Sequence, residues 1–432
     1  MTVSSDAGAW PTAAPANSPA RVLFASMIGT TIEFFDFYIY ATAAVLVFPR
    51  LFFPAGDPNA AMLQSLATFA LAFFARPVGS AVFGHFGDRV GRKATLVAAL
   101  LTMGLSTVAI GLLPTHAQVG VLAPALLALC RFGQGLGLGG EWGGAVLLAT
   151  ENAPPGKRAW YGMFPQLGAP VGFILATGAF IALDRWLDDA AFFAWGWRVP
   201  FLGSAVLVAL GLWMRLRLEE TPAFRRVLER KELQRMPVLS VLSEHPRALL
   251  AGVFASLATF VLFYLMTVFA LGWATLELGY ARDAFLWLQL VGVAFFAFTI
   301  PLAAVAADRR GRRAAMVAVT LAIAVFGLAF DVLFVGGDAA RIVVFLVLGM
   351  CLMGFTYGPL GAYLAEQFPA PVRYSGTSLA FNLSGILGAS LAPYAAMWLA
   401  ARFGIASVGW YLTVASLLTL AALLAAPRAR DD

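Results

Sequence analysis

Four ionisable side chains lie in the middle of long apolar stretches of this sequence. Glu33 and Asp36 share one stretch, Arg76 lies in the next, and Arg131 in a later one. If these stretches are membrane helices, a rise of ~1.5 Å per residue puts Glu33, Arg76 and Arg131 about 15–18 Å deep, near the centre of a bilayer. Ionisable groups at that depth cost roughly 2.5–3.5 kcal/mol each, so they are candidates for function.

These residue types suit proton coupling and anion binding. A buried carboxylate can take up and release a proton as its surroundings change, and arginine offers a charged planar fork to a carboxylate. Asp36 lies one helical turn beyond Glu33, and Tyr40 extends the same face. We predict proton coupling by Glu33, Asp36 and Arg131, and substrate contacts from Arg131, Arg76 and Tyr40. The alternative is a set of fixed ion pairs that hold helices together.

The composition requires a membrane around these residues. Hydrophobic residues make up 61% of the 432-residue chain and charged residues 12%, with a mean hydropathy of +0.82. A soluble protein could not bury that much apolar surface. The basic residues behind the net charge of +6 lie between the apolar stretches, and no aromatic residues alternate with them. This pattern excludes a nucleic-acid partner. Cys130 and Cys351 are expected to be buried thiols, and no spacing indicates a metal or cofactor.

Two segments of the chain are repeated. Residues 84–93 (GHFGDRVGRK) return 220 positions later as 304–313 (AVAADRRGRR). Residues 151–158 (ENAPPGKR) return 215 positions later as 366–373 (EQFPAPVR). Internal repetition between apolar stretches predicts a secondary transporter made of two similar halves.

The apolar pattern predicts an all-α membrane protein with twelve spans. They are 22–48, 61–86, 94–113, 119–149, 158–183, 196–217, 247–276, 284–307, 314–335, 341–365, 373–401 and 407–426. We expect a six-helix bundle over 21–218 and another over 247–426, joined by a polar loop with a surface helix over 219–246. Residues 1–20 contain no Lys or Arg and are expected to be a disordered tail rather than a signal peptide, and 427–432 a second tail.

Lys and Arg residues are distributed unequally between the two sides of these spans. The side that holds the N-terminus carries 21 and the opposite side 6. Basic loops remain in the cytoplasm, so both termini and the central loop are predicted to be cytoplasmic, in a multi-pass protein of the cell inner (plasma) membrane.

Polar residues on other spans are further candidates for substrate contact. Gln166 and Asn382 each begin a helix interrupted by Gly or Pro, which is typical of transporter binding sites, and Gln134 and Tyr357 also lie within spans. Hydrogen bonding between helices is an equal alternative for each of them. Glu141, inside the run GGEWGG, fits a gate or a helix contact equally well.

The segment Gly84–Lys93 resembles the signature of the major facilitator superfamily, and 304–313 resembles its weaker second copy. Within that superfamily the chain is similar to the metabolite:proton symporters, especially shikimate-permease-like members. The matching stretches are Gly29–Phe37, Phe74–Gly79, Arg131–Gly135, Gly140–Gly144, Phe164–Gly168, Glu220–Phe224 and Arg373–Gly376.

The resemblance implies two six-helix bundles around a central cavity, alternating access, and proton-coupled uptake of a small organic acid or zwitterion. It also implies a cytoplasmic gate, with Asp88 and Arg92 as latch residues and Asp308 and Arg312 as weaker partners. The gate candidates are Gly84, Asp88, Arg89, Gly91, Arg92, Glu141, Glu151, Asp308 and Arg312. A monomer in the lipid bilayer is the default expectation.

The sequence departs from the family pattern at three positions. Phe34 stands where Trp is usual, and Ala304 and Ala307 replace motif glycines, which predicts a looser second latch. A sugar porter is a less favoured alternative, because the span from Phe254 to Trp273 lacks the glutamine pair usual there. A membrane sensor with this fold is a second alternative, and coupling to sodium instead of protons stays open.

Overall fold

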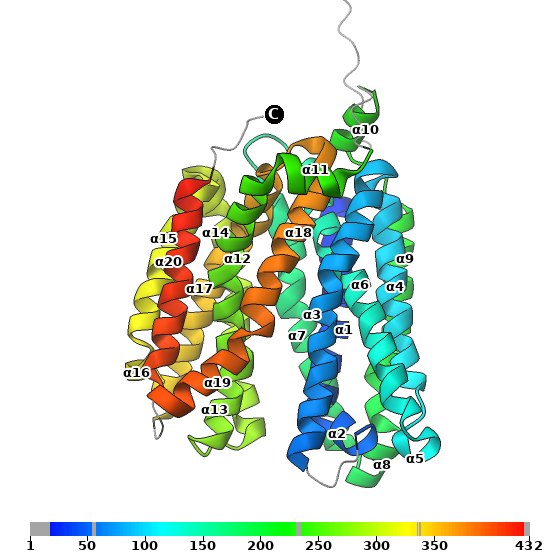
Figure 1. Ribbon diagram of the computed structural model, residues 1–432, viewed down its shortest axis with the longest axis vertical. Helices are drawn as coiled ribbons and strands as arrows, with labels where there is room; N and C mark the ends of the chain where they lie inside the picture. Colours follow the sequence, from blue (N-terminus) through cyan, green and yellow to red (C-terminus); the bar gives the residue numbers. More distant parts are fainter. Residues whose placement is uncertain (1–17, 54–57, 230–234, 335, 337, 427–432) are drawn as a thin grey trace, which may run out of the picture.

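The computed structural model describes residues 18–53, 58–229, 235–334, 336 and 338–426. Within these ranges all regular structure is helical. The C-terminal tail and all of the N-terminal tail before residue 18 lie outside the described residues. Figure 1 shows two upright bundles, with the first half of the chain in one and the second half in the other.

The first bundle is built from six long helices and several short ones. Its helices are α1 (Pro19–Leu46), α2 (Phe48–Leu51), α3 (Pro58–Arg89), α4 (Arg92–Leu112), α5 (His116–Val119), α6 (Leu122–Glu151), α7 (Arg158–Trp186), α8 (Asp189–Ala194), a 3₁₀ turn (Gly196–Arg198) and α9 (Val199–Leu216). The segment between the bundles forms α10 (Pro222–Glu229) and α11 (Pro237–Glu244). We call the end of the molecule where these two helices lie the α11 end (Figure 1).

The second bundle repeats this plan with two interrupted helices. Its helices are α12 (Pro246–Tyr264), a π-helical turn (Leu265–Phe269), α13 (Ala270–Leu276), α14 (Arg282–Arg310), α15 (Arg312–Leu328), α16 (Phe330–Leu333), α17 (Ala339–Glu366), a 3₁₀ turn (Ala370–Val372), α18 (Arg373–Gly385), a π-helical turn (Ile386–Ser390), α19 (Ala392–Phe403) and α20 (Ala406–Ala425).

Eleven helices in the described part of the chain are long and apolar enough to cross a membrane. The predicted ninth span, 314–335, is divided between α15, which has 17 residues, and the short α16. Adding this pair gives the twelve-helix architecture that the sequence predicts.

Glycines allow close packing in the first bundle. A Cβ at Gly139 would lie 2.1 Å from the carbonyl oxygen of Arg76, and one at Gly135 would lie 2.6 Å from that of Ala72. Helices α3 and α6 therefore touch backbone to backbone, which positions the buried polar residues of both.

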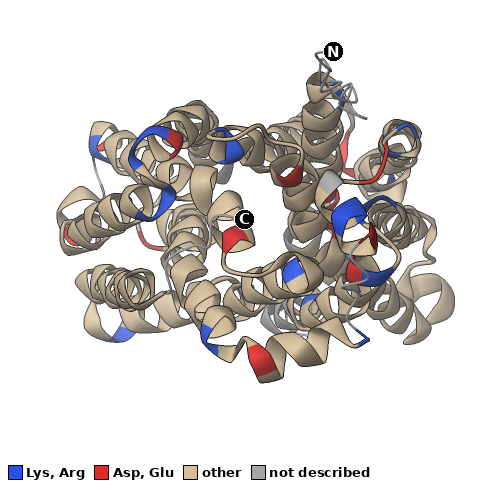
Figure 2. Cartoon of the chain, turned by 90° about the horizontal axis from the view of Figure 1, so that it is seen from above, with Lys and Arg blue, Asp and Glu red and all other residues tan. Residues whose placement is uncertain are grey.

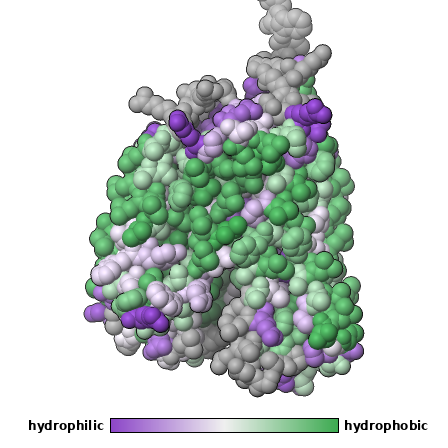
Figure 3. Space-filling view, in the orientation of Figure 1, coloured by the Kyte–Doolittle hydropathy of each residue, from purple (hydrophilic) through white to green (hydrophobic). Residues whose placement is uncertain are grey.

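The outer surface matches a membrane protein. Apolar side chains cover most of the visible lateral surface, and hydrophilic ones collect towards the two ends (Figure 3). Viewed onto the α11 end, the helices form two groups, with most of the charged residues towards the viewer (Figure 2).

Candidate functional site

A cavity of about 40 Å³ lies between the two bundles. Helices α1, α3 and α7 line it from the first bundle, and α12, α14, α17 and α18 from the second. Its lining is mostly aromatic, with a single carboxylate and a single guanidinium: Glu33, Phe34, Phe37, Tyr38, Arg76, Ala169, Thr259, Phe260, Phe263, Tyr264, Phe296, Met353, Tyr357 and Phe381.

Polar atoms without partners face this central cavity. Glu33 and Arg76 are only 4% and 8% exposed. Glu33 Oε2, Arg76 Nε and the Tyr38 hydroxyl make no hydrogen bond. The Arg76 guanidinium packs over the rings of Phe37 and Phe73, at 4.9 and 4.8 Å. Buried charged groups are normally paired, so these atoms are candidates for contact with a ligand.

Asp36 lies away from the cavity, inside the first bundle. Three residues advance a helix by about 300°, which leaves a 60° offset from Glu33. Asp36 accepts hydrogen bonds from Thr107 of α4 (2.7 Å) and Ser204 of α9 (2.6 Å). The predicted common face of Glu33 and Asp36 therefore separates into a cavity side and a bundle-core side.

A chain of hydrogen bonds connects Arg131 to Asp36. Arg131 Nη1 donates to Gln134 Oε1 (3.0 Å), and Gln134 Nε2 donates to the Thr107 hydroxyl (2.7 Å), which donates to Asp36. All of these side chains are buried. Their donors point in one direction, from the guanidinium to the carboxylate.

Arg131 does not line the central cavity. Its guanidinium packs over the ring of Tyr40 at 3.9 Å, with Phe69 at 5.0 Å and Phe37 at 5.3 Å. The Tyr40 hydroxyl donates to Thr68 (2.8 Å). The ring of Phe37 thus contacts Arg76 on the cavity side and Arg131 in the bundle core. Of the two arginines, only Arg76 lines the central cavity.

Glu141 forms a buried ion pair inside the first bundle. Its carboxylate accepts a hydrogen bond from Arg215 at the end of α9, and the same arginine donates to the carbonyl of Leu96 (2.8 Å). The geometry is a contact between helices, which is one of the two roles that the sequence left open. Arg215 is only 2% exposed.

A layer of contacts closes the interface between the cavity and the α11 end. Gln166 accepts from the Trp142 indole (2.8 Å) and donates to the carbonyl of Tyr357 in the other bundle (2.9 Å). The Trp142 ring stacks on Phe381 at 3.5 Å. Asn382 donates to the Ser80 hydroxyl (2.8 Å) across the same interface. Gln166 and Asn382 therefore join the bundles, whereas Tyr357 lines the cavity.

The first motif copy forms a latch across the bundles, which we call the Asp88 latch. The Asp88 carboxylate accepts hydrogen bonds from the backbone N–H groups of Tyr374 (3.1 Å) and Ser375 (2.9 Å) in the first turn of α18. It also lies 3.0 Å from Arg92. Asp88 therefore caps a helix of the opposite bundle, where a negative charge is favourable.

Arg92 and Glu151 extend this latch. Arg92 Nη2 donates to the carbonyl of Ala370 (3.3 Å) and to Glu151 (3.5 Å). Glu151 lies 3.9 Å from Arg373 of the second bundle and accepts a hydrogen bond from Thr221 (2.5 Å).

The second copy forms the mirror arrangement, which we call the Asp308 latch. The Asp308 carboxylate accepts from the backbone N–H groups of Ala159 (2.9 Å) and Trp160 (2.8 Å), in the first turn of α7. Arg312 lies 3.4 Å from Asp308 and also pairs with Glu366. Each motif aspartate thus caps the partner bundle.

The remaining gate candidates have different surroundings. Gly84 lies against α18, where a Cβ would be 2.9 Å from the Cα of Ser375. Gly91 is the residue directly before α4 and has a φ of 126°, a backbone conformation that strongly favours glycine. Arg89 is exposed and contacts His85 (3.3 Å), so it lies beside the Asp88 latch without joining it.

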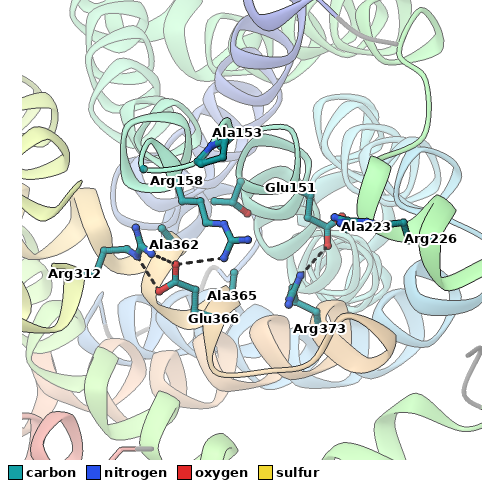
Figure 4. Close-up of a pocket in the computed structure, with 13 residues that line it drawn as sticks. Glu151, Ala153, Arg158, Ala223, Arg226, Arg312, Ala362, Ala365, Glu366 and Arg373 are labelled. Atoms are coloured by element: carbon teal, nitrogen blue, oxygen red, sulfur yellow. Dashed lines mark hydrogen bonds and ion pairs between the residues drawn. The ribbon is translucent and has the colours of Figure 1, made fainter. Parts of the chain in front are cut away.

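A cavity of about 390 Å³ lies at the α11 end between the latches. Figure 4 shows its charged side chains, with Arg312 and Arg158 around Glu366, and Arg373 beside Glu151. We call it the arginine cavity. The repeat of 151–158 at 366–373 contains four of its charged residues, but the sequence gave no sign of a cavity, because the lining comes from five separate segments.

Sequence reasoning also missed residues that complete the buried networks. Thr107 and Ser204 hold Asp36, Arg215 holds Glu141, and Trp142 closes the interface. The only available signal was small polar or aromatic residues at helical spacing within apolar stretches, which many structural positions share.

Comparisons with known proteins match this geometry. Residues 22–251 match the family model "Sugar (and other) transporter". The "Inner membrane metabolite transport protein YhjE" of Escherichia coli is 58% identical over 95% of this chain and 94% of its own. The chain belongs to the major facilitator superfamily. It is therefore a membrane transporter of small solutes rather than an enzyme.

Other relatives and solved structures agree. A shikimate transporter of Escherichia coli is 36% identical, with 89% of this chain and 88% of the relative covered. A proline/betaine transporter of Salmonella typhimurium is 33% identical, with 88% and 77% covered. The structure of the proton:xylose symporter XylE has the same fold, with a TM-score of 0.75, 17% identity and 95% of each chain covered.

Proposed function

We propose that this chain is an inner-membrane symporter that moves a small organic acid or zwitterion into the cell together with protons. The observation that carries the proposal is the unpaired, buried Glu33 and Arg76 in one cavity between the bundles. A substrate carboxylate pairs with Arg76, and Glu33 takes the proton or contacts a cationic group of the substrate. Relatives named for metabolite, shikimate and proline/betaine transport support this class.

The lining suggests further selectivity. A single guanidinium matches a single carboxylate, while a second carboxylate would stay unpaired and desolvated. The surrounding rings suit a flat, apolar or quaternary ammonium body. The cavity must widen before such a molecule can enter, since known ligand pockets measure about 300–1,000 Å³.

The two latches support transport by alternating access. We infer that the α11 end faces the cytoplasm, because 21 of the Lys and Arg residues lie on that side. The structure is closed at this end, where Asp88 and Asp308 hold the bundles together. Release of both latches would open the substrate site to the cytoplasm.

Asp36 is the second candidate for proton coupling. It lies at the end of the chain of hydrogen bonds from Arg131. A change in its protonation would alter its hydrogen bond with Thr107 and, through Thr107, the one made by Gln134. These residues belong to α4 and α6, and α6 also contributes Trp142 to the closed interface. Proton binding in the bundle core can thus be coupled to closure between the bundles.

Uptake by purified protein in proteoliposomes tests the proposal. Shikimate, benzoate, glycine betaine and citrate would be supplied as labelled solutes, with the outside more acidic than the lumen. Accumulation of one monocarboxylate or zwitterion should depend on the pH gradient and collapse with an uncoupler. Uptake driven by a sodium gradient and indifferent to pH would refute proton coupling.

Two variants separate the roles of the cavity charges. Glu33→Gln should abolish accumulation but keep exchange of labelled for unlabelled substrate, because binding persists without the proton. Arg76→Gln should abolish both, because the substrate carboxylate loses its partner. Glu244→Gln, at the exposed end of α11, is the control. Normal exchange in Arg76→Gln would show that the substrate binds elsewhere.

A further inference from the structure

The arginine cavity has the dimensions and the charge of a ligand site. Its volume of about 390 Å³ lies within the range of small-molecule pockets. Both bundles and α10 contribute to its wall. Four guanidinium groups and two carboxylates line it: Arg158, Arg226, Arg312, Arg373, Glu151 and Glu366.

The lining holds four guanidinium groups but only two carboxylates, and Glu366 is already paired with Arg312. Glu151 is shared with Arg92 and Thr221, which lie outside the lining. Arg373 also donates to the carbonyl of Phe368 (3.0 Å), whereas the ion pair from Arg158 to Glu366 measures 3.8 Å. Charge-assisted hydrogen bonds are about 2.7–2.9 Å long, so the Arg158 contact is loose.

Arg226 adds a further positive charge. It is exposed on α10 and makes no hydrogen bond or ion pair within the described residues. Its neighbour Arg225 does not line the cavity and pairs with Glu219 at 2.6 Å. The cavity thus has excess positive charge, with donors on both bundles and on the segment between them.

We propose that the arginine cavity binds a small polyanion with two or more carboxylate or phosphate groups. Arginine forks bind such groups bidentately, and a ligand with two groups can reach the arginines beside Glu366 and those beside Glu151 together. A ligand that contacts both bundles stabilises the state in which they are closed at this end. Cytoplasmic polyanions would therefore slow transport by holding both latches shut.

This site is distinct from the central cavity. The two cavities share no lining residue. The contacts of Gln166 with Tyr357 and of Asn382 with Ser80 belong to the closed layer between the central cavity and the α11 end. The ligand of the arginine cavity is therefore a regulator and not the transported substrate.

Titration calorimetry with pyrophosphate as the probe tests this on the full chain in detergent. Wild type should bind it saturably. Arg226→Gln should raise the Kd about tenfold, which corresponds to ~1.4 kcal/mol for one charge-assisted contact. Arg225→Gln, one residue earlier, should leave the Kd within about twofold of wild type. Because both side chains are exposed, neither change disturbs a buried contact.

Three results would overturn the proposal: no saturable binding, equal Kd values for Arg226→Gln and Arg225→Gln, or loss of binding in Arg76→Gln, which would place the anion in the central cavity. Nanodiscs then identify the source of the anionic groups. Weaker pyrophosphate binding in cardiolipin-containing nanodiscs than in pure phosphatidylcholine would assign the site to lipid phosphates. Equal binding in both would assign it to a soluble polyanion.

Discussion

The Asp88 and Asp308 latches share one design but differ in burial. In each, a motif aspartate accepts hydrogen bonds from two N–H groups in the first turn of a helix in the other bundle. The side chains of Asp88 and Arg92 are 0% exposed, whereas those of Asp308 and Arg312 are 10% and 21% exposed. The same motif therefore forms one latch that is fully buried and one that is partly exposed to solvent. Removing the charge of the aspartate should affect closure differently in the two.

The two motif copies also differ in their glycines. A Cβ at Gly87 would lie 2.2 Å from the ring of Tyr374, and one at Gly84 would lie 2.9 Å from the Cα of Ser375. The corresponding residues of the second copy are Ala307 and Ala304, which are both fully buried. We infer that the methyl groups of Ala304 and Ala307 prevent, in the Asp308 latch, the close approach that Gly84 and Gly87 allow in the Asp88 latch. The hydrogen bonds of the Asp308 latch are no longer than those of the Asp88 latch, so the looser second latch expected from the sequence stays a prediction.

Asp88→Asn should have the largest effect on closure at the α11 end. It preserves the shape but removes the charge that faces Arg92 and the first turn of α18, which leaves a buried guanidinium with less compensation. We expect the closed state to lose about 3 kcal/mol. The closed population can be measured by double electron–electron resonance, which gives the distance between spin labels at positions 90 and 310. Cys130 and Cys351 would first be replaced so that only these two positions carry a label.

Asp189→Asn, an exposed aspartate at the opposite end, is the matched control for this charge change. If Asp88→Asn left the distance distribution as in wild type, the Asp88 latch would not determine closure.

Gly87→Ala should have the second largest effect, because it gives the first copy the methyl group of the second. The new Cβ overlaps the Tyr374 ring, so α3 and α18 must move apart. This should destabilise the closed state by about 2 kcal/mol. Gly178→Ala is the control, since no atom lies within 4 Å of its Cβ. A closed population equal to that of Gly178→Ala would show that the interface absorbs the methyl group elsewhere.

Much of the fold was predictable because long apolar stretches have one solution in lipid. The predicted span 284–307 lies within α14, and 341–365 lies within α17. The motif also indicated Asp88 and Asp308. Their partners were not predictable, because they are backbone N–H groups of Tyr374 and Ala159, which have no side-chain signature and meet the aspartates only after the bundles pack.

The candidate site was less predictable than the fold. Depth in the membrane follows from counting residues, but the direction of a side chain depends on how each helix is rotated. Arg76 and Arg131 were predicted at the same depth, yet only Arg76 lines the central cavity. Arg215, at the end of the predicted span 196–217, pairs with Glu141 inside the first bundle, and the sequence did not indicate this pair.

Asp308→Asn should weaken closure less than Asp88→Asn. Water already reaches this latch, and Arg312 keeps Glu366 as a partner. We expect a loss of about 1 kcal/mol, measured with the same pair of spin labels. The loss should diminish in high salt, unlike that of Asp88→Asn, because only exposed charges are screened effectively. Equal losses in the two variants would mean that burial does not distinguish the latches.

The smallest net effect is expected from Ala304→Gly combined with Ala307→Gly, which gives the second copy the glycine pair of the first. Two glycines within α14 cost about 2 kcal/mol of helix stability, and closer approach to α7 should recover part of it. The free-energy difference between the closed and open states should therefore change by less than about 1 kcal/mol. The distance between the labels in the closed state should become shorter. An unchanged distance would show that the two methyl groups do not hold the Asp308 latch apart, and that the pairing of Arg312 with Glu366 keeps it open to water.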